Sequence, residues 1–318
     1  MKRFKLRKGD ASVYPVTTKQ DFESITGGKS PYVIESKSGK KGFAICPACE
    51  NPVQIIGIYK KIKNESIKPY AKHYNRDAAI SKHNEYTYKF CPYASQIYSS
   101  NEEYETKTEI SELEYNIYYT LKNNFDAAIY LLQQVSGLYM NKEYIKETLQ
   151  SYVASEGHLY YGSTIYNLPW LLLYMHTMPA IPCYGRIIRK NSFLYNMFTQ
   201  VPDIIYEDTE KLPGYVIVKG KAGKYIDYQF SFNQHRREII DDEVQESMTL
   251  TLVSNKLESQ DNPVGFVQLK DNKIYINETR FPNLLCSEKM KEYRKTKKNQ
   301  DLLRMAEELM PDIEKPER

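Results

Sequence analysis

The 318-residue sequence contains few cysteines, a single tryptophan and no long apolar run. Five cysteines, an odd number without framework spacing, do not suit a disulfide-stapled secreted scaffold. The best apolar stretch, LPWLLLYMHTMPAIP, is shorter than the roughly 20 residues of a membrane span and is interrupted by prolines. The charged start, MKRFKLRK, lacks the apolar core of a signal peptide. We therefore expect no membrane association and a cytoplasmic, reducing location.

The composition is that of a folded protein with a mild positive charge. Hydrophobic residues make up 41% of the chain and 29 residues are tyrosines, which is enough to build a core. The length suits two or three domains. The net charge of +4 does not by itself indicate nucleic acid. Basic clusters at 1–8, 59–68 and 289–298 are more typical of solvated lysine faces than of phosphate-binding surfaces.

The motif CPAC places two cysteines, Cys46 and Cys49, three positions apart. A structural zinc ion normally takes four ligands in a tetrahedron, so two more ligands are needed. Downstream, Cys91 opens a second Cys-Pro step, and His73 and His83 precede it. Thiolate and imidazole are ligands that zinc prefers. The predicted set is Cys46, Cys49, Cys91 and one histidine, with His73 favoured because it follows a basic-apolar strand, and His83 as the alternative.

Such a site would be structural, because four protein ligands leave no open position for catalysis. The alternative interpretation is that Cys46 and Cys49 are buried thiols or a redox pair, although no βαβ pattern surrounds them. Cys183 and Cys286 lack metal-like spacing, and we expect both in the core.

The patterning along the chain predicts an α+β or α/β protein. Ser111 and Glu114 have capping-box spacing at the start of a helical region that continues to about 155, and a further helix is expected around 164–175. After 182 the chain consists of short β-rich runs, closed by a helix over 299–310. The predicted segments are a basic N-terminal segment with short strands (1–42), a zinc-ribbon-like module (43–95), a helical region (96–181), a mixed α/β domain (182–310) and a frayed tail (311–318).

A second group of candidate site residues lies in the β-rich part. Asp203 follows a proline at the end of an apolar run, and Asp227 and Gln229 are expected in one strand. Residues two apart in a strand point to the same face, so Asp227 and Gln229 would converge on Asp203 from a neighbouring strand. Two carboxylates could then hold Mg²⁺ and activate a water. Alternatively, Asp203 is a turn residue and Asp227 lies on a solvent face.

The segments VPDIIYE and GKYIDYQFSF resemble the PD-(D/E)xK nuclease superfamily, with Gln229 at the position of the usual lysine. The Cys-x-x-Cys module ahead of them is similar to the competence-protein CoiA family, in which a histidine-containing segment follows the cysteines. KPYAKH would be that segment, and IDYQFS matches a strand pattern of the family. The resemblance implies Asp203, Asp227 and Gln229 as site residues of a Mg²⁺-dependent nuclease. The helical insert between the two parts is longer than expected of that family.

The segment NQHRREIIDDEVQES at 233–247 is dense in charge. Its basic side chains, His235, Arg236 and Arg237, could contact phosphate. Its acidic side chains, Asp242, Glu243 and Glu246, could bind a metal. An exposed helix or loop is the simpler interpretation.

We therefore expect an intracellular zinc-module protein that binds nucleic acid or a partner protein, with structural zinc as its cofactor. A divergent or inactive nuclease would add Mg²⁺, but binding is favoured over catalysis. The alternative is a non-enzymatic protein-binding factor, such as a bacterial defence or phage counter-defence accessory. The Lys, Asn, Ile and Tyr bias is typical of an AT-rich bacterial genome.

Overall fold

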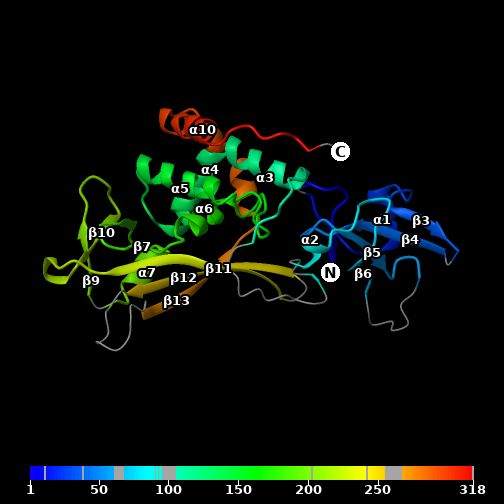
Figure 1. The fold of residues 1–318 in the computed structure, drawn as a ribbon, viewed down its shortest axis with the longest axis horizontal. Coiled ribbons are helices and arrows are strands. Elements are labelled where there is room, and N and C mark those ends of the chain that lie inside the picture. The colour runs from blue at the N-terminus through cyan, green and yellow to red at the C-terminus, as the bar shows by residue number, and fades with distance from the viewer. Residues whose placement is uncertain are drawn as a thin grey trace. The chain divides into compact units, whose positions relative to one another are not determined.

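The computed structural model describes residues 1–10, 12–37, 39–60, 68–89, 91, 93–94, 105–201, 203–240, 243–254 and 267–316. The protein is a mixed α+β protein with antiparallel sheets. Its chain divides into two compact units (Figure 1). Unit 1 contains Met1–Glu102 and Arg237–Gln245, and unit 2 contains Glu103–Arg236 and Glu246–Arg318.

Unit 1 is built on a four-stranded antiparallel sheet in the order β3-β4-β5-β6. Its elements are β1 (Arg3–Phe4), β2 (Tyr14–Pro15), α1 (Lys19–Thr26), β3 (Val33–Ser36), β4 (Gly39–Ile45), β5 (Pro52–Ile56), β6 (Tyr70–His73) and α2 (Glu85–Lys89). Helix α1 was not expected from the sequence. Thr18 and Asp21 form a capping box at its start, and Gly27 ends it in the left-handed conformation at φ 70°.

One face of this sheet forms the core of unit 1. The side chains of Ala44, Val53, Ile55 and Ala71 alternate towards this face and pack with Phe22 of α1. The same cluster contains Cys46 and Cys91, so the core continues directly into the cysteine region.

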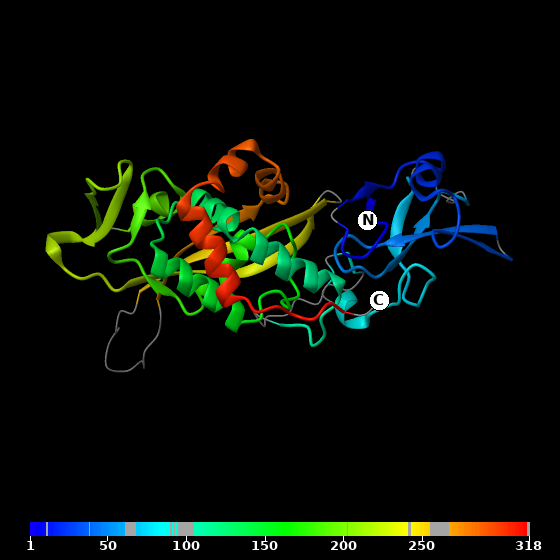
Figure 2. The ribbon, with the colours of Figure 1, turned by 90° about the horizontal axis from the view of Figure 1, so that it is seen from above.

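Unit 2 combines helices with two further sheets, in the orders β8-β10-β9 and β13-β12-β11-β7. Its helices are α3 (Glu112–Asn123), α4 (Phe125–Ser136), α5 (Lys142–Ala154), α6 (Leu168–His176), α7 (Phe193–Phe198), α8 (Arg280–Leu285), α9 (Glu288–Tyr293) and α10 (Lys297–Leu309). Its strands are β7 (Ile181–Pro182), β8 (Ile187–Arg189), β9 (Ile204–Asp208), β10 (Tyr215–Gly220), β11 (Tyr228–Ile240), β12 (Glu243–Ser254) and β13 (Val267–Ile276). The helix α10 packs on α3, α4 and α5 (Figure 2).

The helical region and the β-rich region that follows it share one hydrophobic core. Leu121, Trp170, Phe230 and Leu250 are buried in the same cluster, although the sequence analysis assigned them to two segments, 96–181 and 182–310. The amphipathic helices bury their apolar stripe against the sheet, so neither region has a core of its own. The predicted capping box of Ser111 and Glu114 is present at the start of α3.

The first residues of the C-terminal tail, Pro311 to Ile313, are bound to α3. The Tyr118 hydroxyl donates to the Pro311 carbonyl at 2.6 Å, and Lys122 pairs with the Asp312 carboxylate at 2.8 Å. The Tyr119 hydroxyl also donates to Asp312, at 3.0 Å. These contacts join the tail to one face of α3, where the sequence pattern alone shows no partner. Within the described part of the chain, every helix is too short or too polar to cross a membrane.

Candidate metal centre

Four predicted ligands converge in unit 1. The ligand atoms of Cys46, Cys49, His73 and Cys91 all lie within 4.8 Å of one another. The Cys46 and Cys91 sulfurs are 3.7 Å apart, and the His73 Nε2 lies 3.3 Å from the Cys49 sulfur and 3.6 Å from that of Cys91. The structure thus brings together the set favoured from the sequence. Among the described residues, no second group of three or more His, Cys, Asp or Glu side chains is this close.

Strand register explains how the four residues meet. Cys46 directly follows β4 and lies two residues after Ala44, so both side chains point to the core face. On β6, His73 pairs with Val53, which lies on the same face. The peptide of Cys46 closes the knuckle, because its N–H donates to the Asn51 carbonyl at 2.8 Å.

A buried ion pair fixes the turn between the first two cysteines. Glu50 has a φ of 57° and donates its N–H to the Cys46 carbonyl at 3.1 Å. Its carboxylate lies 3.5 Å from the Lys5 ammonium and accepts a hydrogen bond from the Gly9 N–H at 2.8 Å. Because Lys5 also pairs with Ile45 through its backbone, the N-terminal segment is fastened to the knuckle.

Asn51 supports the cluster from behind and is almost fully buried. Its side-chain amide donates to the Cys49 sulfur at 3.3 Å and to the Thr87 hydroxyl at 2.8 Å. Its carbonyl oxygen accepts from the Asn84 N–H at 2.6 Å. One side chain therefore links the knuckle to the start of α2, and its N–H donor stabilises negative charge on the Cys49 sulfur.

The electrostatics favour one thiolate in the absence of an ion. Burial opposes ionisation of Cys46, but hydrogen bonds from Cys49, Cys91 and His73 outweigh it and lower the pKa of the Cys46 thiol. Burial raises the pKa of Cys49 and of Cys91, and the neighbouring sulfurs add to that shift at Cys91. A bound cation would remove this repulsion and deprotonate all three thiols.

The spacing of the four ligand atoms suits a tetrahedral zinc ion. Zinc bonds of about 2.3 Å to sulfur and about 2.0 Å to nitrogen give tetrahedron edges of about 3.8 Å between sulfurs and about 3.5 Å between sulfur and nitrogen. The separations of 3.7 Å between Cys46 and Cys91 and of 3.3 and 3.6 Å to His73 are close to these edges. Three sulfurs and one imidazole are also the donor type that zinc prefers over Mg²⁺ or Ca²⁺.

His83, the alternative histidine, is outside this group. Its ring lies 5.8 Å from that of Tyr88, and its backbone N–H donates to the Asp77 carboxylate at 2.8 Å. Tyr88 also packs edge-on against His73 at 5.0 Å, so one aromatic ring contacts both histidines.

The three residues of the nuclease-like pattern lie in unit 2, around the start of β11. Asp203 is an exposed turn residue, and its carboxylate accepts a hydrogen bond from the Tyr228 hydroxyl at 2.9 Å. Asp227 is exposed and precedes β11, and Gln229 lies in β11 opposite Pro182. Side chains alternate along a strand, so Tyr228 and Gln229 point to opposite faces of β11. Asp203 therefore contacts Tyr228, the residue between Asp227 and Gln229, whose side chain points to the face opposite that of Gln229.

The charged segment 233–247 is not an exposed helix or loop, because its described residues belong to β11 and β12. The side chains of His235 and Glu246 are buried, 1% and 9% exposed, and their Nε2 and Oε1 atoms are 2.6 Å apart. The Tyr160 hydroxyl lies 3.0 Å from His235 Nδ1, and the Asn167 amide donates to Glu246. His235 and Glu246 therefore bind each other inside unit 2 rather than a phosphate or a metal.

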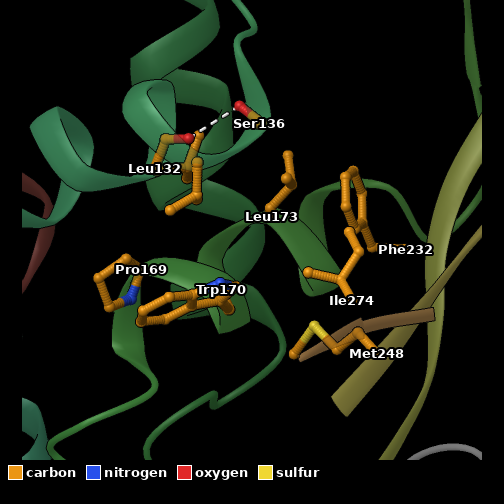
Figure 3. Close-up of a pocket in the computed structure, with 9 residues that line it drawn as sticks. Leu132, Ser136, Pro169, Trp170, Leu173, Phe232, Met248 and Ile274 are labelled. Carbon is orange, nitrogen blue, oxygen red and sulfur yellow. Dashed lines mark hydrogen bonds between the residues drawn. The ribbon is translucent and has the colours of Figure 1, made fainter. Parts of the chain in front are cut away.

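A small apolar cavity in unit 2 offers no alternative site. It measures about 20 Å³, which is room for little more than one water. Figure 3 shows its lining of Leu132, Pro169, Trp170, Leu173, Phe232, Met248 and Ile274, with the Ser136 hydroxyl bonded to the Leu132 carbonyl at 2.8 Å. Ligand sites typically measure about 300–1,000 Å³ and contain several polar groups, so this is a packing gap.

No protein-family model, curated protein or solved structure matches the chain.

Proposed function

We propose that unit 1 is a zinc-stabilised module through which the protein binds nucleic acid. Zinc binding is supported by the convergence of Cys46, Cys49, His73 and Cys91 at spacings close to those of a ZnS₃N tetrahedron. Zinc would cross-link the β4–β5 turn to β6 and to the segment after α2, as in a zinc ribbon. Since all four positions are filled by protein, the ion would stabilise the fold and perform no chemistry.

The charge distribution supports nucleic acid as the partner. Unit 1, residues 1–102 and 237–245, contains 19 Lys and Arg against 13 Asp and Glu, whereas unit 2 contains 25 against 27. The excess of positive charge in the chain therefore lies in unit 1. Exposed lysines of unit 1 include Lys2, Lys8, Lys60, Lys68 and Lys72. A basic surface of this kind attracts the phosphate backbone. The resemblance to the CoiA family points in the same direction.

Of the three basic clusters noted in the sequence, the one at 289–298 is partly neutralised by acidic neighbours. In the cluster at 289–298, Lys291 pairs with Glu288 and Lys295 with Glu292, both at 2.6 Å within one helical turn. These pairs reduce the positive charge available to a phosphate. In the cluster at 59–68, residues 61–67 lie outside the described part of the chain.

We do not propose that Asp203, Asp227 and Gln229 hydrolyse nucleic acid. The Asp203 carboxylate accepts the Tyr228 hydroxyl, and Gln229 lies on the other face of the strand. A Mg²⁺ site needs carboxylate oxygens that share one cation, and Asp203 and Asp227 are both exposed, with the Asp203 carboxylate bonded to the Tyr228 hydroxyl. Binding of a protein partner, the alternative function, is an outcome of the experiment below.

The test is binding of the zinc-loaded full chain to DNA and RNA oligonucleotides as a function of salt. Counterion release predicts that log affinity falls linearly with log salt, by about 0.7–0.9 for each phosphate contacted. A Lys2→Glu/Lys8→Glu/Lys68→Glu variant with unchanged zinc content should bind more weakly and with a shallower slope. Lys291→Glu, in the paired cluster, is the control and should change little. Absence of binding at low salt would contradict the proposal and favour a protein partner.

A further inference from the structure

The sheet of unit 1 has a second face, opposite the metal centre, and its register can be read across three strands. Phe43 of β4 pairs with Gln54 of β5, and Gln54 pairs with Lys72 of β6. Cross-strand partners point to the same face, so these three side chains form a row. The side chains of the core, including Ala44, alternate to the other face.

A neighbouring row runs parallel to the first. Lys41, two residues before Phe43, pairs with Ile34 of β3, and Ile56, two residues after Gln54, pairs with Tyr70 of β6. Because residues two apart share a face, both pairs point the same way as the Phe43 row.

The edge of this face is aromatic and basic. Along β6 and just beyond it, Tyr70, Lys72 and Tyr74 alternate to this side, and Tyr74 continues the pairing by donating its N–H to the Pro52 carbonyl at 2.9 Å. Lys72 is exposed and both tyrosines are half-buried. Phe43, only 6% exposed, packs edge-on against Tyr74 at 5.2 Å between ring centres and so sets the orientation of that ring.

The charges on this face are all of one sign. Among the described residues of β3 to β6 that point this way, two are lysines and none is acidic. The one acidic residue of these strands, Glu35, pairs with Lys40, and both point to the opposite face, where their charged atoms lie 3.6 Å apart. We call Lys41, Gln54, Tyr70, Lys72 and Tyr74 the sheet platform.

We propose that the sheet platform binds single-stranded nucleic acid, with bases stacked on Tyr70 and Tyr74 and phosphates at Lys41 and Lys72. Aromatic side chains on an open sheet can stack only on bases that are not already stacked in a duplex. The lysines beside the rings supply the complementary charge, and Gln54 between them offers both a donor and an acceptor to a base edge. This inference rests on the proposed function and specifies its ligand class.

The experiment measures affinity of the zinc-loaded full chain for a fluorescein-labelled 12-nucleotide oligothymidylate and for a 12-base-pair duplex. The wild-type protein should prefer the single strand. Tyr70→Ala should weaken single-strand binding by about 5- to 100-fold, because stacking on that ring is lost. Tyr70→Phe keeps the ring and should restore most of the affinity. Lys72→Ala should weaken binding and lower the log–log salt slope by about 0.7.

Lys40→Ala is the matched control, because Lys40 is the neighbour of Lys41 on the same strand but points to the opposite face. It should leave the single-strand preference unchanged. Zinc content and far-UV circular dichroism of each variant show whether the module remains folded. Binding that is equal for both nucleic acids, or that Tyr70→Ala and Lys40→Ala alter alike, would overturn the platform but leave the proposed function standing. No binding to either nucleic acid would overturn both.

Discussion

Loss of one metal ligand should unfold unit 1 and leave unit 2 intact. Structural zinc ions contribute about 10–16 kcal/mol of apparent binding free energy, which is also folding free energy. Replacing Cys91 by serine removes one of four ligands, or roughly a quarter of that free energy, about 2.5–4 kcal/mol. The remaining stability is small, because the described core cluster of unit 1 contains 11 buried residues, including Cys46 and Cys91, against 46 in unit 2. A whole domain is typically stable by only about 5–15 kcal/mol.

Hydrogen exchange followed by mass spectrometry measures this effect unit by unit. In the Cys91→Ser variant, amides of β4 and β5 should exchange much faster than in the wild type, whereas those of α4 and α6 should keep their protection. A chelator added to the wild-type protein should give the same pattern. Cys286→Ser is the control, because Cys286 is exposed and outside the cluster. Protection of β4 and β5 that survives both treatments would refute this reasoning.

Three further predictions concern other parts of the molecule. Burial, aided by Arg186, lowers the pKa of His176 from 6.5 to about 4, so the stability that this neutral imidazole contributes is present above pH 6.5 and lost as the pH falls towards 4. In His176→Gln, the unfolding free energy from denaturant titration should therefore change less across that window, by about 1–2 kcal/mol given the partial exposure of the ring. Asn51→Leu should lower zinc affinity about 10- to 100-fold in a chelator competition, since Cys49 loses its donor. Wild-type protein and Asp227→Ala should show equally little Mg²⁺-dependent DNA cleavage, and cleavage abolished by Asp227→Ala would restore the nuclease assignment.

The convergence of Cys46, Cys49, His73 and Cys91 was predictable from the sequence because the ligand preferences of zinc limit the choices. Two Cys-Pro steps and two histidines leave few sets of four ligands. The choice between His73 and His83 depended on the placement of a strand before His73. The register of β6 then decides it, since His73 pairs with Val53 on the core face. The strand before His73 is a local feature, and the types of its residues are enough to predict it.

The capping box at Ser111 was recognised in the sequence, whereas the one at Thr18 was not. Ser111 and Glu114 follow the usual pattern and were recognised. Thr18 and Asp21 form the same reciprocal contacts, but with aspartate at the position where glutamate or glutamine is usual. The helix that follows has eight residues and buries few of them, so its apolar periodicity is weak as well.

The charged segment at 233–247 was misread because a backbone irregularity reverses the strand phase. Tyr228, Phe230 and Phe232 alternate into the core, and Gln234 would be the next inward side chain. Gln234 instead adopts a φ of 48° and stays exposed, which turns His235 inwards to Glu246. No sequence period reveals this change of backbone conformation, because Gln234 is not a glycine and shows no preference for positive φ.

One zinc ion held by Cys46, Cys49, His73 and Cys91 is the basis of the proposed function. Elemental analysis combined with zinc X-ray absorption on protein purified without added metal tests it most directly. We expect one zinc per chain with three sulfur neighbours at about 2.3 Å and one nitrogen at about 2.0 Å. Zinc bound through oxygen, or a folded unit 1 that contains no metal, would contradict it.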